Sequence, residues 1–435
     1  MDGNFTARLG HPFYRDRVLY VAYDRWPGLP ILRAWEFGGW RKESLSWRTG
    51  CYIHGGLSGN GPISIRGPEA KKYLQSIVIN SLETFPIGSM KHAVMCTEDG
   101  LIAAHGIVER KAEDHFESFA GGPPGIYLDT AAPFDVEVKR LEKYLFQIAG
   151  PTSLQVLEKA TGENLRDVRF LRFRDTHING LKTEIGRIGM TGGLAYELHG
   201  PIEEGPAIYD AVYQAGQAFG IERLGWGTYL VNHVEGGFPQ HSWTFVGAAP
   251  APVRLERMTK MFVVSGSVDP TDTRARMRTP VEVRWHNMAR FDHDFVGREA
   301  LAAETASPRR TTVTLRWNGE DVLDTFASLM RPGPSYKTID LPYAPQRWPM
   351  AHADHVLMGA KEIGYSSGTI YSSGFREFLS LGCIDISAAQ LGNEVIVQWG
   401  DHGAQLKNVR AAVARFPYVS GGRNSDLDVT STSAG

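Results

Sequence analysis

The chain has 435 residues, which is too long for one ordinary hydrophobic core and predicts two or three domains. Its charged residues (22%) and hydrophobic residues (42%) are in the proportions of a soluble globular protein. A formal net charge of −2 without blocks of like charge excludes the electrostatic footprint of a nucleic-acid or membrane-surface protein, so we expect a small molecule as partner.

Residues 1–50 are rich in aromatic side chains and are typical of an arm that packs across a body. Trp26-Pro27 and Pro30 interrupt any helix before Trp35. The first residues lack the apolar segment of a secretory signal, and no run approaches the ~20 apolar residues of a membrane-spanning helix. The cysteines are isolated and form neither a disulfide framework nor a zinc pattern. These features predict a cytoplasmic protein.

Two α+β units of similar layout follow, interleaved along the chain. For residues 51–139, alternation and helical spacing predict the strands Pro62–Arg66, Ala93–Cys96 and Leu101–Glu109 and the helix Glu69–Ile77, with a turn at residues 98–100. For residues 140–250 they predict the strands Tyr144–Ile148 and Lys182–Ile188 and the helices Ser153–Ala160 and Glu204–Phe219, the last ending at Gly220.

A glycine-rich turn with a carboxylate just beyond it lies in residues 186–200, GRIGMTGGLAYELHG. Gly192 and Gly193 let a backbone approach a flat ligand closely, and Leu194–Leu198 is predicted to be a short strand. Glu197 on this strand can accept two neighbouring N–H donors, such as those on the edge of a pterin or purine. Taken alone, the segment favours an ordinary hairpin whose glutamate faces solvent.

The C-terminal part of the chain has a different pattern. Residues 251–308 are predicted to connect the lobes; Asp292, His293 and Asp294 among them are metal-ligand types, but neighbouring side chains point apart, so no metal site is predicted. The last ~120 residues alternate in short runs, which is typical of a β-barrel or jelly roll. The tail 421–435 is rich in Ser, Thr, Asp and Gly and is predicted to be disordered.

A second motif, ERLGWGTYLVNHVEGGFP at residues 222–239, carries Tyr229, Asn232 and Glu235. Together with residues 186–200 it resembles the aminomethyltransferase (glycine-cleavage T-protein) superfamily. Within it, the chain is most similar to the tetrahydrofolate-dependent aromatic O-demethylases of the vanillate and syringate branch, which share the Tyr-x-x-Asn-x-x-Glu spacing. Further segments agree in order, including EFGGW, SIRGPEA, FQIAGP, FDHDFVGREAL and SLGCID.

This resemblance implies a three-lobed α+β fold around a central opening. Residues 1–50 with 140–250 would form the folate-binding lobe, 51–139 a second α+β lobe, and 251–420 the connecting region and the C-terminal β-barrel lobe. The implied cofactor is tetrahydrofolate, held by Glu197 and Gln147, with Tyr196, Asn232 and Glu235 as further binding residues.

The resemblance also places Tyr229 at the position of the general acid. An aryl ether resists cleavage because its leaving group is a phenolate, and a tyrosine of pKa ~10 is matched to protonate such an oxygen. The glycine-cleavage enzymes have an arginine at this position, so Tyr229 favours an aryl ether over an aminomethyl substrate. A buried tyrosine with a structural hydrogen bond is the alternative.

Three departures from the look-alike enzymes bear on the substrate. Ala104-His105 and His54 stand where relatives carry acidic residues, so His54 and His105 are either structural or take part in proton transfer. The arginine that grips a benzoate falls near Gly121-Gly122, and its loss predicts an uncharged, larger aromatic substrate.

We therefore expect removal of a methyl group from an aromatic methyl ether, giving a phenol and 5-methyl-tetrahydrofolate. The alternative within the same site is opening of a methylenedioxy ring, giving a catechol and 5,10-methylene-tetrahydrofolate. A third alternative is a folate-binding protein without catalytic activity, which the departures at residues 104–105 and 121–122 would suit.

Overall fold

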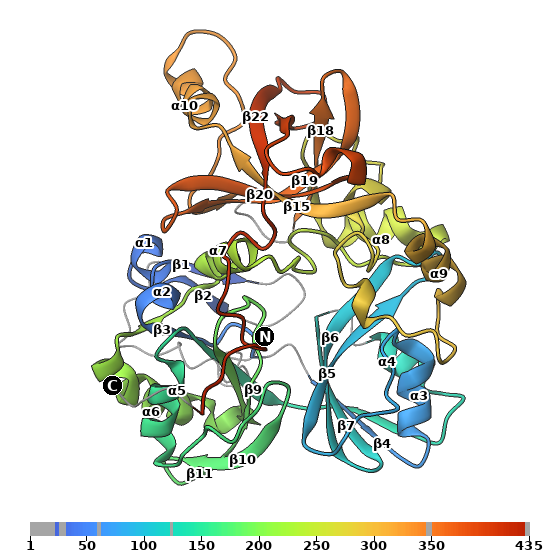
Figure 1. The fold of residues 1–435 in the computed structure, drawn as a ribbon, viewed down its shortest axis with the longest axis vertical. Helices are drawn as coiled ribbons and strands as arrows, with labels where there is room; N and C mark the ends of the chain where they lie inside the picture. Colours follow the sequence, from blue (N-terminus) through green and yellow to red (C-terminus); the bar gives the residue numbers. More distant parts are fainter. Residues whose placement is uncertain (1–21, 26–31, 59–61, 122–124, 345–349, 431–435) are drawn as a thin grey trace, which may run out of the picture.

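The structure is a computed structural model that describes residues 22–25, 32–58, 62–121, 125–344 and 350–430. Three lobes surround helix α7 (Trp226–Gly236), with two α+β lobes side by side below it and a β-barrel above it in the view of Figure 1. Their sheets are separate, as the predicted three-lobed α+β fold requires. Within the described residues, no helix combines the length and the apolar character needed to cross a membrane.

The first lobe is a six-stranded sheet in the order β10-β11-β12-β9-β3-β13. Helices α5 (Ser153–Thr161) and α6 (Gly205–Gly216) pack on one face of it around a core that includes Phe146 and Tyr196. The strands are β10 (Phe173–Ile178), β11 (Leu181–Gly186), β12 (Ala195–Pro201), β9 (Lys143–Ala149), β3 (Cys51–His54) and β13 (Ile221–Arg223). The other face of the sheet turns towards α7 and the second lobe.

The second lobe is a five-stranded sheet in the order β5-β6-β7-β4-β8, with α3 (Ala70–Ile77) packed on one face. Its strands are β5 (Ser89–Cys96), β6 (Ile102–Ala112), β7 (His115–Gly121), β4 (Ile63–Arg66) and β8 (Glu137–Arg140), and α4 (Gly125–Thr130) follows β7. Alternation along β6 buries Ala104 and Val108 against α3, so Glu109 lies on the face towards the first lobe.

The C-terminal lobe contains a closed barrel. Six strands follow one another as β19-β18-β21-β22-β15-β20, and β20 pairs again with β19. They are β19 (Lys361–Ser372), β18 (Asp354–Met358), β21 (Glu394–Trp399), β22 (Lys407–Ala414), β15 (Arg310–Trp317) and β20 (Glu377–Asp385). Of the two predicted alternatives the structure selects the barrel.

Shorter elements join this lobe to the others. The connecting residues fold as α8 (Arg254–Met261) and α9 (Arg298–Ala306), and α10 (Gly319–Ala327) projects beside the barrel (Figure 1). Strand β16 (Tyr343–Ala344) pairs with β19, and β14 (Val263–Ser265) pairs with β17 (Met350–His352). The expectation that neighbouring side chains point apart in residues 292–294 is wrong for Asp292 and His293, since Oδ1 of the first lies 2.7 Å from Nδ1 of the second.

The N-terminal arm packs across the body, as predicted, in the part that the structure describes. It contains β1 (Ala22–Arg25), β2 (Leu32–Glu36), α1 (Trp40–Glu43) and α2 (Ser46–Thr49). Helix α7 starts at a close approach to this arm, because a side chain at Gly225 would clash with the carbonyl of Trp35. The buried carboxylate of Glu43 accepts hydrogen bonds from the Gly225 N–H (2.8 Å) and the Thr228 hydroxyl (3.2 Å). Trp26-Pro27 and Pro30 lie outside the described residues.

Two predicted boundaries are corrected by the structure. Strand β3 belongs to the first lobe and not to the second, because Tyr52 to His54 pair with β9 and residues 51–53 pair with β13. The tail is not disordered over residues 421–430: Asn424 is buried and donates from Nδ2 to the carbonyl of Ala195 (3.0 Å). The guanidinium of Arg187 donates to the side chain and carbonyl of the same asparagine (2.9 and 2.7 Å). Residues 431–435 lie outside the described part.

Candidate functional site

Three adjacent strands of the first lobe place predicted site residues in one row. Glu197 on β12 lies opposite Gln147 on β9, and Gln147 lies opposite His54 on β3. Because cross-strand partners point to the same face of a sheet, all three side chains lie on the side away from α5 and α6. All three are at least 94% buried. The structure therefore brings together Glu197, Gln147 and His54.

A chain of hydrogen bonds joins this row to α7. The hydroxyl of Tyr52 donates to Oε1 of Gln147 (2.6 Å), and Nδ2 of Asn232 donates to the Tyr52 hydroxyl (3.2 Å). Nε2 of Gln147 lies 3.5 Å from Oε1 of Glu197, at the long limit of a hydrogen bond. Asn232 thus reaches the row through Tyr52, which the sequence analysis did not single out.

Tyr229 lies on the same side of the sheet, in a stack of rings. Its ring is parallel to that of His54 (centroids 4.0 Å apart, 9° between planes), and Trp226 continues the stack. Burial, with Tyr52 and Glu197 nearby, raises the pKa of Tyr229 well above its usual range. The phenol is therefore protonated at every physiological pH and can act as a proton donor. Its hydroxyl lies 4.0 Å from the sulfur of Met190.

The two candidate histidines have different surroundings. His54 donates from Nδ1 to the carbonyl of Leu224 (2.9 Å) and stacks on Tyr229. His105 lies on β6 of the second lobe, with its Nε2 3.1 Å from Nδ1 of His92 and its ring 4.4 Å from that of Trp285. Burial, then His92 and His241, lowers the pKa of His105 well below its usual range, so this ring is neutral. Only His54 of the pair stacks directly on the Tyr229 ring.

Tyr196 and Glu235 are placed away from this row. Alternation along β12 turns Tyr196 to the opposite face from Glu197, into the core with α5 and α6. Glu235, at the end of α7, accepts from Nη2 of Arg48 (2.9 Å) and Nε1 of Trp47 (3.1 Å), and its second oxygen accepts from the hydroxyl of Ser372. Both oxygens of Glu235 are therefore engaged by the arm and the barrel.

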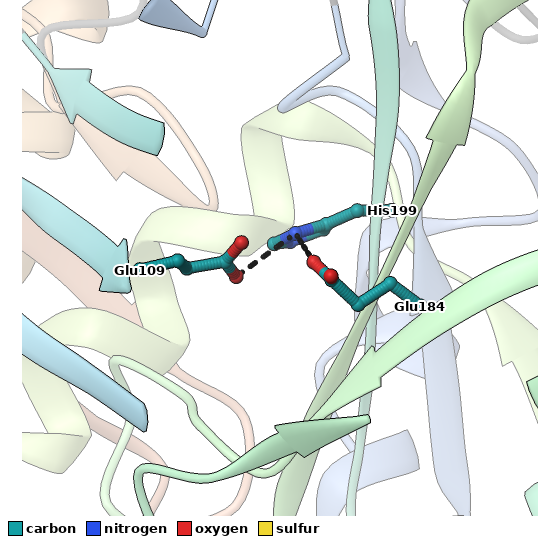
Figure 2. Close-up of side chains that lie close together, drawn as sticks. All are labelled: Glu109, Glu184 and His199. Carbon is teal, nitrogen blue, oxygen red and sulfur yellow. Dashed lines mark ion pairs between the residues drawn. The ribbon is translucent and has the colours of Figure 1, made fainter. Parts of the chain in front are cut away.

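A buried charge cluster between the two α+β lobes was missed in the sequence. His199 Nδ1 lies 3.2 Å from Oε1 of Glu109 and 3.5 Å from Oε1 of Glu184, as Figure 2 shows. Its other nitrogen, Nε2, lies 3.5 Å from Oε2 of Glu197. The alternation of AYELHG was a usable signal, because it puts His199 on the same face as Glu197. Glu109 comes from the other lobe, which sequence spacing cannot reveal.

The ligand atoms of Glu109, Glu184 and His199 lie within 4.8 Å of one another, which is close enough for a shared metal ion. The ammonium of Lys111, however, contacts Glu184 and lies 3.2 Å from Oε2 of Glu109. Lys111 and His199 thus supply positive charge from within the chain. We interpret the group as an ion-pair cluster.

The ionisation of this cluster follows from its charges. Burial alone would lower the pKa of His199, but Glu109, then Glu184 and Glu197, hold it well above its usual range. Hydrogen bonding to His199 and the charge of Lys111 outweigh burial and lower the pKa of Glu184. His199 is therefore an imidazolium among carboxylates.

To bind tetrahydrofolate, the buried carboxylate of Glu197 would have to accept further hydrogen bonds. A carboxylate has about four lone-pair sites. The contacts of its two oxygens with Gln147 and His199 are both 3.5 Å long. Adjacent N–H donors of a pterin can satisfy such a group, so the residues fit the cofactor implied by the sequence.

Comparisons with known proteins agree with this geometry. The family model described as the GCVT N-terminal domain matches residues 20–251. Sesamin methylene transferase from Sinomonas sp. (strain No.22) is 37% identical over 421 residues, covering 91% of this chain and 92% of that protein. Syringate O-demethylase from Sphingobium sp. strain SYK-6 is 28% identical and covers 93% of this chain and 92% of that protein.

The fold has a match among solved structures. The glycine cleavage system aminomethyltransferase T from Bartonella henselae superposes with a TM-score of 0.65 over 92% of this chain and 94% of that chain. At 17% identity this likeness concerns the fold alone.

Proposed function

Because this chain belongs to the aminomethyltransferase family defined by the GCVT N-terminal domain, we propose that it transfers a one-carbon unit from an aromatic ether to tetrahydrofolate. The family resemblance recognised in the sequence is confirmed, and tetrahydrofolate is the one-carbon acceptor of this family. The observation that carries the proposal is Tyr229: a buried, protonated phenol stacked on His54, next to the row that contains Glu197.

Each site residue has a defined role in the proposed reaction. Glu197 and Gln147 bind and orient the cofactor, which supplies the amine that accepts the one-carbon unit. Tyr229 donates its proton to the ether oxygen as the carbon–oxygen bond breaks, so that a phenol leaves in place of a phenolate. The buried aromatic surroundings of Trp226 and His54 exclude water, which would compete for the one-carbon unit.

Two reactions of this class are supported by different observations. Removal of a methyl group is supported by the match to syringate O-demethylase over almost the whole chain. Opening of a methylenedioxy ring is supported by the higher identity to sesamin methylene transferase. Both reactions would use an acid at the departing aryl oxygen. Methyl transfer would break one carbon–oxygen bond and form one bond to N5 of tetrahydrofolate. Methylene transfer would break two carbon–oxygen bonds and form bonds to N5 and N10, with the two displaced N–H protons ending on the catechol oxygens.

The proposed substrate is uncharged. Strand β7 ends at Gly121, near the position where the look-alike demethylases carry an arginine, and Gly122 lies outside the described residues. A carboxylate on the substrate would lack that bidentate partner. A neutral methoxy- or methylenedioxy-aromatic fits this site better than a benzoate.

The test is a screen of such neutral aromatics with the purified protein and tetrahydrofolate, reading the mass of the folate product. We expect 5-methyl-tetrahydrofolate from a methyl ether or 5,10-methylene-tetrahydrofolate from a methylenedioxy compound. The Tyr229→Phe variant is the control for background transfer. Folate binding without any product would instead support the catalytically inactive folate-binding protein.

A further inference from the structure

We propose that His199 is a positioning residue, which fixes the carboxylate of Glu197 for tetrahydrofolate by joining it to the charge cluster between the two α+β lobes. The inference rests on the proposed function, in which Glu197 binds the cofactor. It adds a residue that touches no substrate and acts through Glu197.

The geometry places the imidazole between two groups of carboxylates. His199 follows Glu197 by two residues on β12, so both side chains lie on the same face. Nε2 faces Oε2 of Glu197 at 3.5 Å. Nδ1 faces Oε1 of Glu109 at 3.2 Å and Oε1 of Glu184 at 3.5 Å (Figure 2). The His199 side chain is 2% exposed.

The doubly protonated ring suits this arrangement, although burial and then the charge of Glu184 raise the pKa of Glu109. A neutral imidazole has one N–H donor, so one of its nitrogens would turn a lone pair towards a carboxylate. The imidazolium carries an N–H on each side, and its charge attracts the carboxylates that lie 3.2–3.5 Å from its nitrogens. The raised pKa of His199 agrees with this state.

The consequence for Glu197 is a carboxylate held at both oxygens. Oε1 faces Nε2 of Gln147, and Oε2 faces Nε2 of His199. These two neighbours fix the plane of the carboxylate and leave further lone pairs for the N–H donors of a ligand. Without His199, only the neutral amide of Gln147 would orient it.

The competing explanation is that His199 merely joins the lobes. Lys143 on β9 offers a matched control, because it contacts Glu117 of the second lobe and belongs to the same interlobe network without touching Glu197. A residue that only joins lobes changes stability, whereas a positioning residue also changes cofactor affinity through Glu197.

The experiment is a double-mutant cycle on the full chain, with the dissociation constant for tetrahydrofolate measured by titration and the melting temperature measured in parallel. We expect His199→Gln and Glu197→Gln each to weaken binding by about 10- to 100-fold, the range for loss of a hydrogen bond to a charged group. The double variant should bind no more weakly than Glu197→Gln, because the effect of His199 passes through Glu197. Lys143→Gln should lower the melting temperature and leave affinity unchanged.

Additive losses, or unchanged affinity in His199→Gln, would overturn the proposal. Unchanged affinity in Glu197→Gln would instead show that the assignment of Glu197 in the proposed function is wrong. If His199→Gln does not fold, Glu184→Gln replaces it in the cycle, since it removes one carboxylate that holds the imidazolium. Non-additive weakening with Glu197→Gln again supports the proposal, and additive or absent weakening overturns it.

Discussion

Two buried carboxylates from the sequence motifs, Glu197 and Glu235, have opposite surroundings. Glu235 has two nitrogen donors at 2.9 and 3.1 Å and a hydroxyl on its second oxygen. Glu197 has two neighbours, both at 3.5 Å. The two residues are similarly buried, with exposed fractions of 1% for Glu235 and 6% for Glu197.

This difference separates a structural carboxylate from a binding one. A buried charge is costly unless hydrogen bonds satisfy it. Glu235 is satisfied within the chain, so it stabilises the junction of arm, α7 and barrel. The contacts of Glu197 are both long, which agrees with our proposal that a ligand with N–H donors completes its hydrogen bonding. The following variants test whether Glu235 has a structural role and Glu197 a binding role.

The largest effect is expected in the Glu197 region, from Tyr229→Phe. The change keeps the ring and its stack on His54 and removes only the acid, so turnover should fall by roughly 10²- to 10⁴-fold. Tetrahydrofolate affinity and stability should change little, because the proton is needed only in the transition state. Steady-state kinetics on the best substrate measures this. Near-normal turnover would make Tyr229 a packing residue and leave His54 as the candidate acid.

In the Glu235 region we expect a loss of stability. Glu235→Ala leaves the guanidinium of Arg48 and the indole of Trp47 without their acceptor, which should lower the free energy of unfolding by about 2–4 kcal/mol. Urea denaturation measures the change, and tetrahydrofolate affinity should be unaltered. If affinity falls while stability stays constant, Glu235 is a ligand residue and the contrast with Glu197 fails.

Glu197→Gln should show the reverse behaviour. The isosteric amide removes a charged acceptor, so affinity for tetrahydrofolate should fall by an amount equivalent to about 1.5–3 kcal/mol. Stability should fall less than in Glu235→Ala, because the contacts of Glu197 within the chain are long. Calorimetric titration beside denaturation measures both quantities in each variant. Equal stability losses in the two variants would contradict the distinction.

The smallest effect is expected from His233, a buried neutral histidine on helix α7, which also carries Glu235. Burial lowers the pKa of His233 to about 4, against about 6.5 in an unfolded chain. Below pH 6.5 the unfolded state therefore binds more protons than the folded state. The contribution of neutral His233 to the free energy of unfolding is fully present above that pH and is lost as the pH falls towards 4. His233→Phe should flatten the pH dependence of unfolding free energy by at most ~1.4 kcal/mol per pH unit. An unchanged slope between pH 6.5 and 5 would show that His233 is not buried as a neutral ring.

Local patterns were enough to predict helices α3, α5 and α6, several strands in each lobe and a β-barrel or jelly roll at the C-terminal end, since alternation and helical spacing are local properties. The resemblance to the aminomethyltransferase superfamily, and not the local pattern, predicted that Glu197, Gln147 and Tyr229 belong to one site. Local patterns did not show that the carboxylate of Glu235 already has hydrogen-bond partners within the chain, because Arg48 and Ser372 are far from it in sequence. The partners of His199 were missed for the same reason: Glu109 lies on another lobe. Tyr196 was included with Glu197 although alternation separates their faces.

The position of Asn424 has a consequence for how the protein is made. This residue bonds to Ala195 and Arg187 in the first lobe, whose sheet also contains β3 near the start of the chain. The buried guanidinium of Arg187 donates to the carbonyls of Asn424 and Leu427, which are synthesised more than 200 residues after it. The first lobe therefore acquires these buried hydrogen bonds only after the barrel strands have been synthesised.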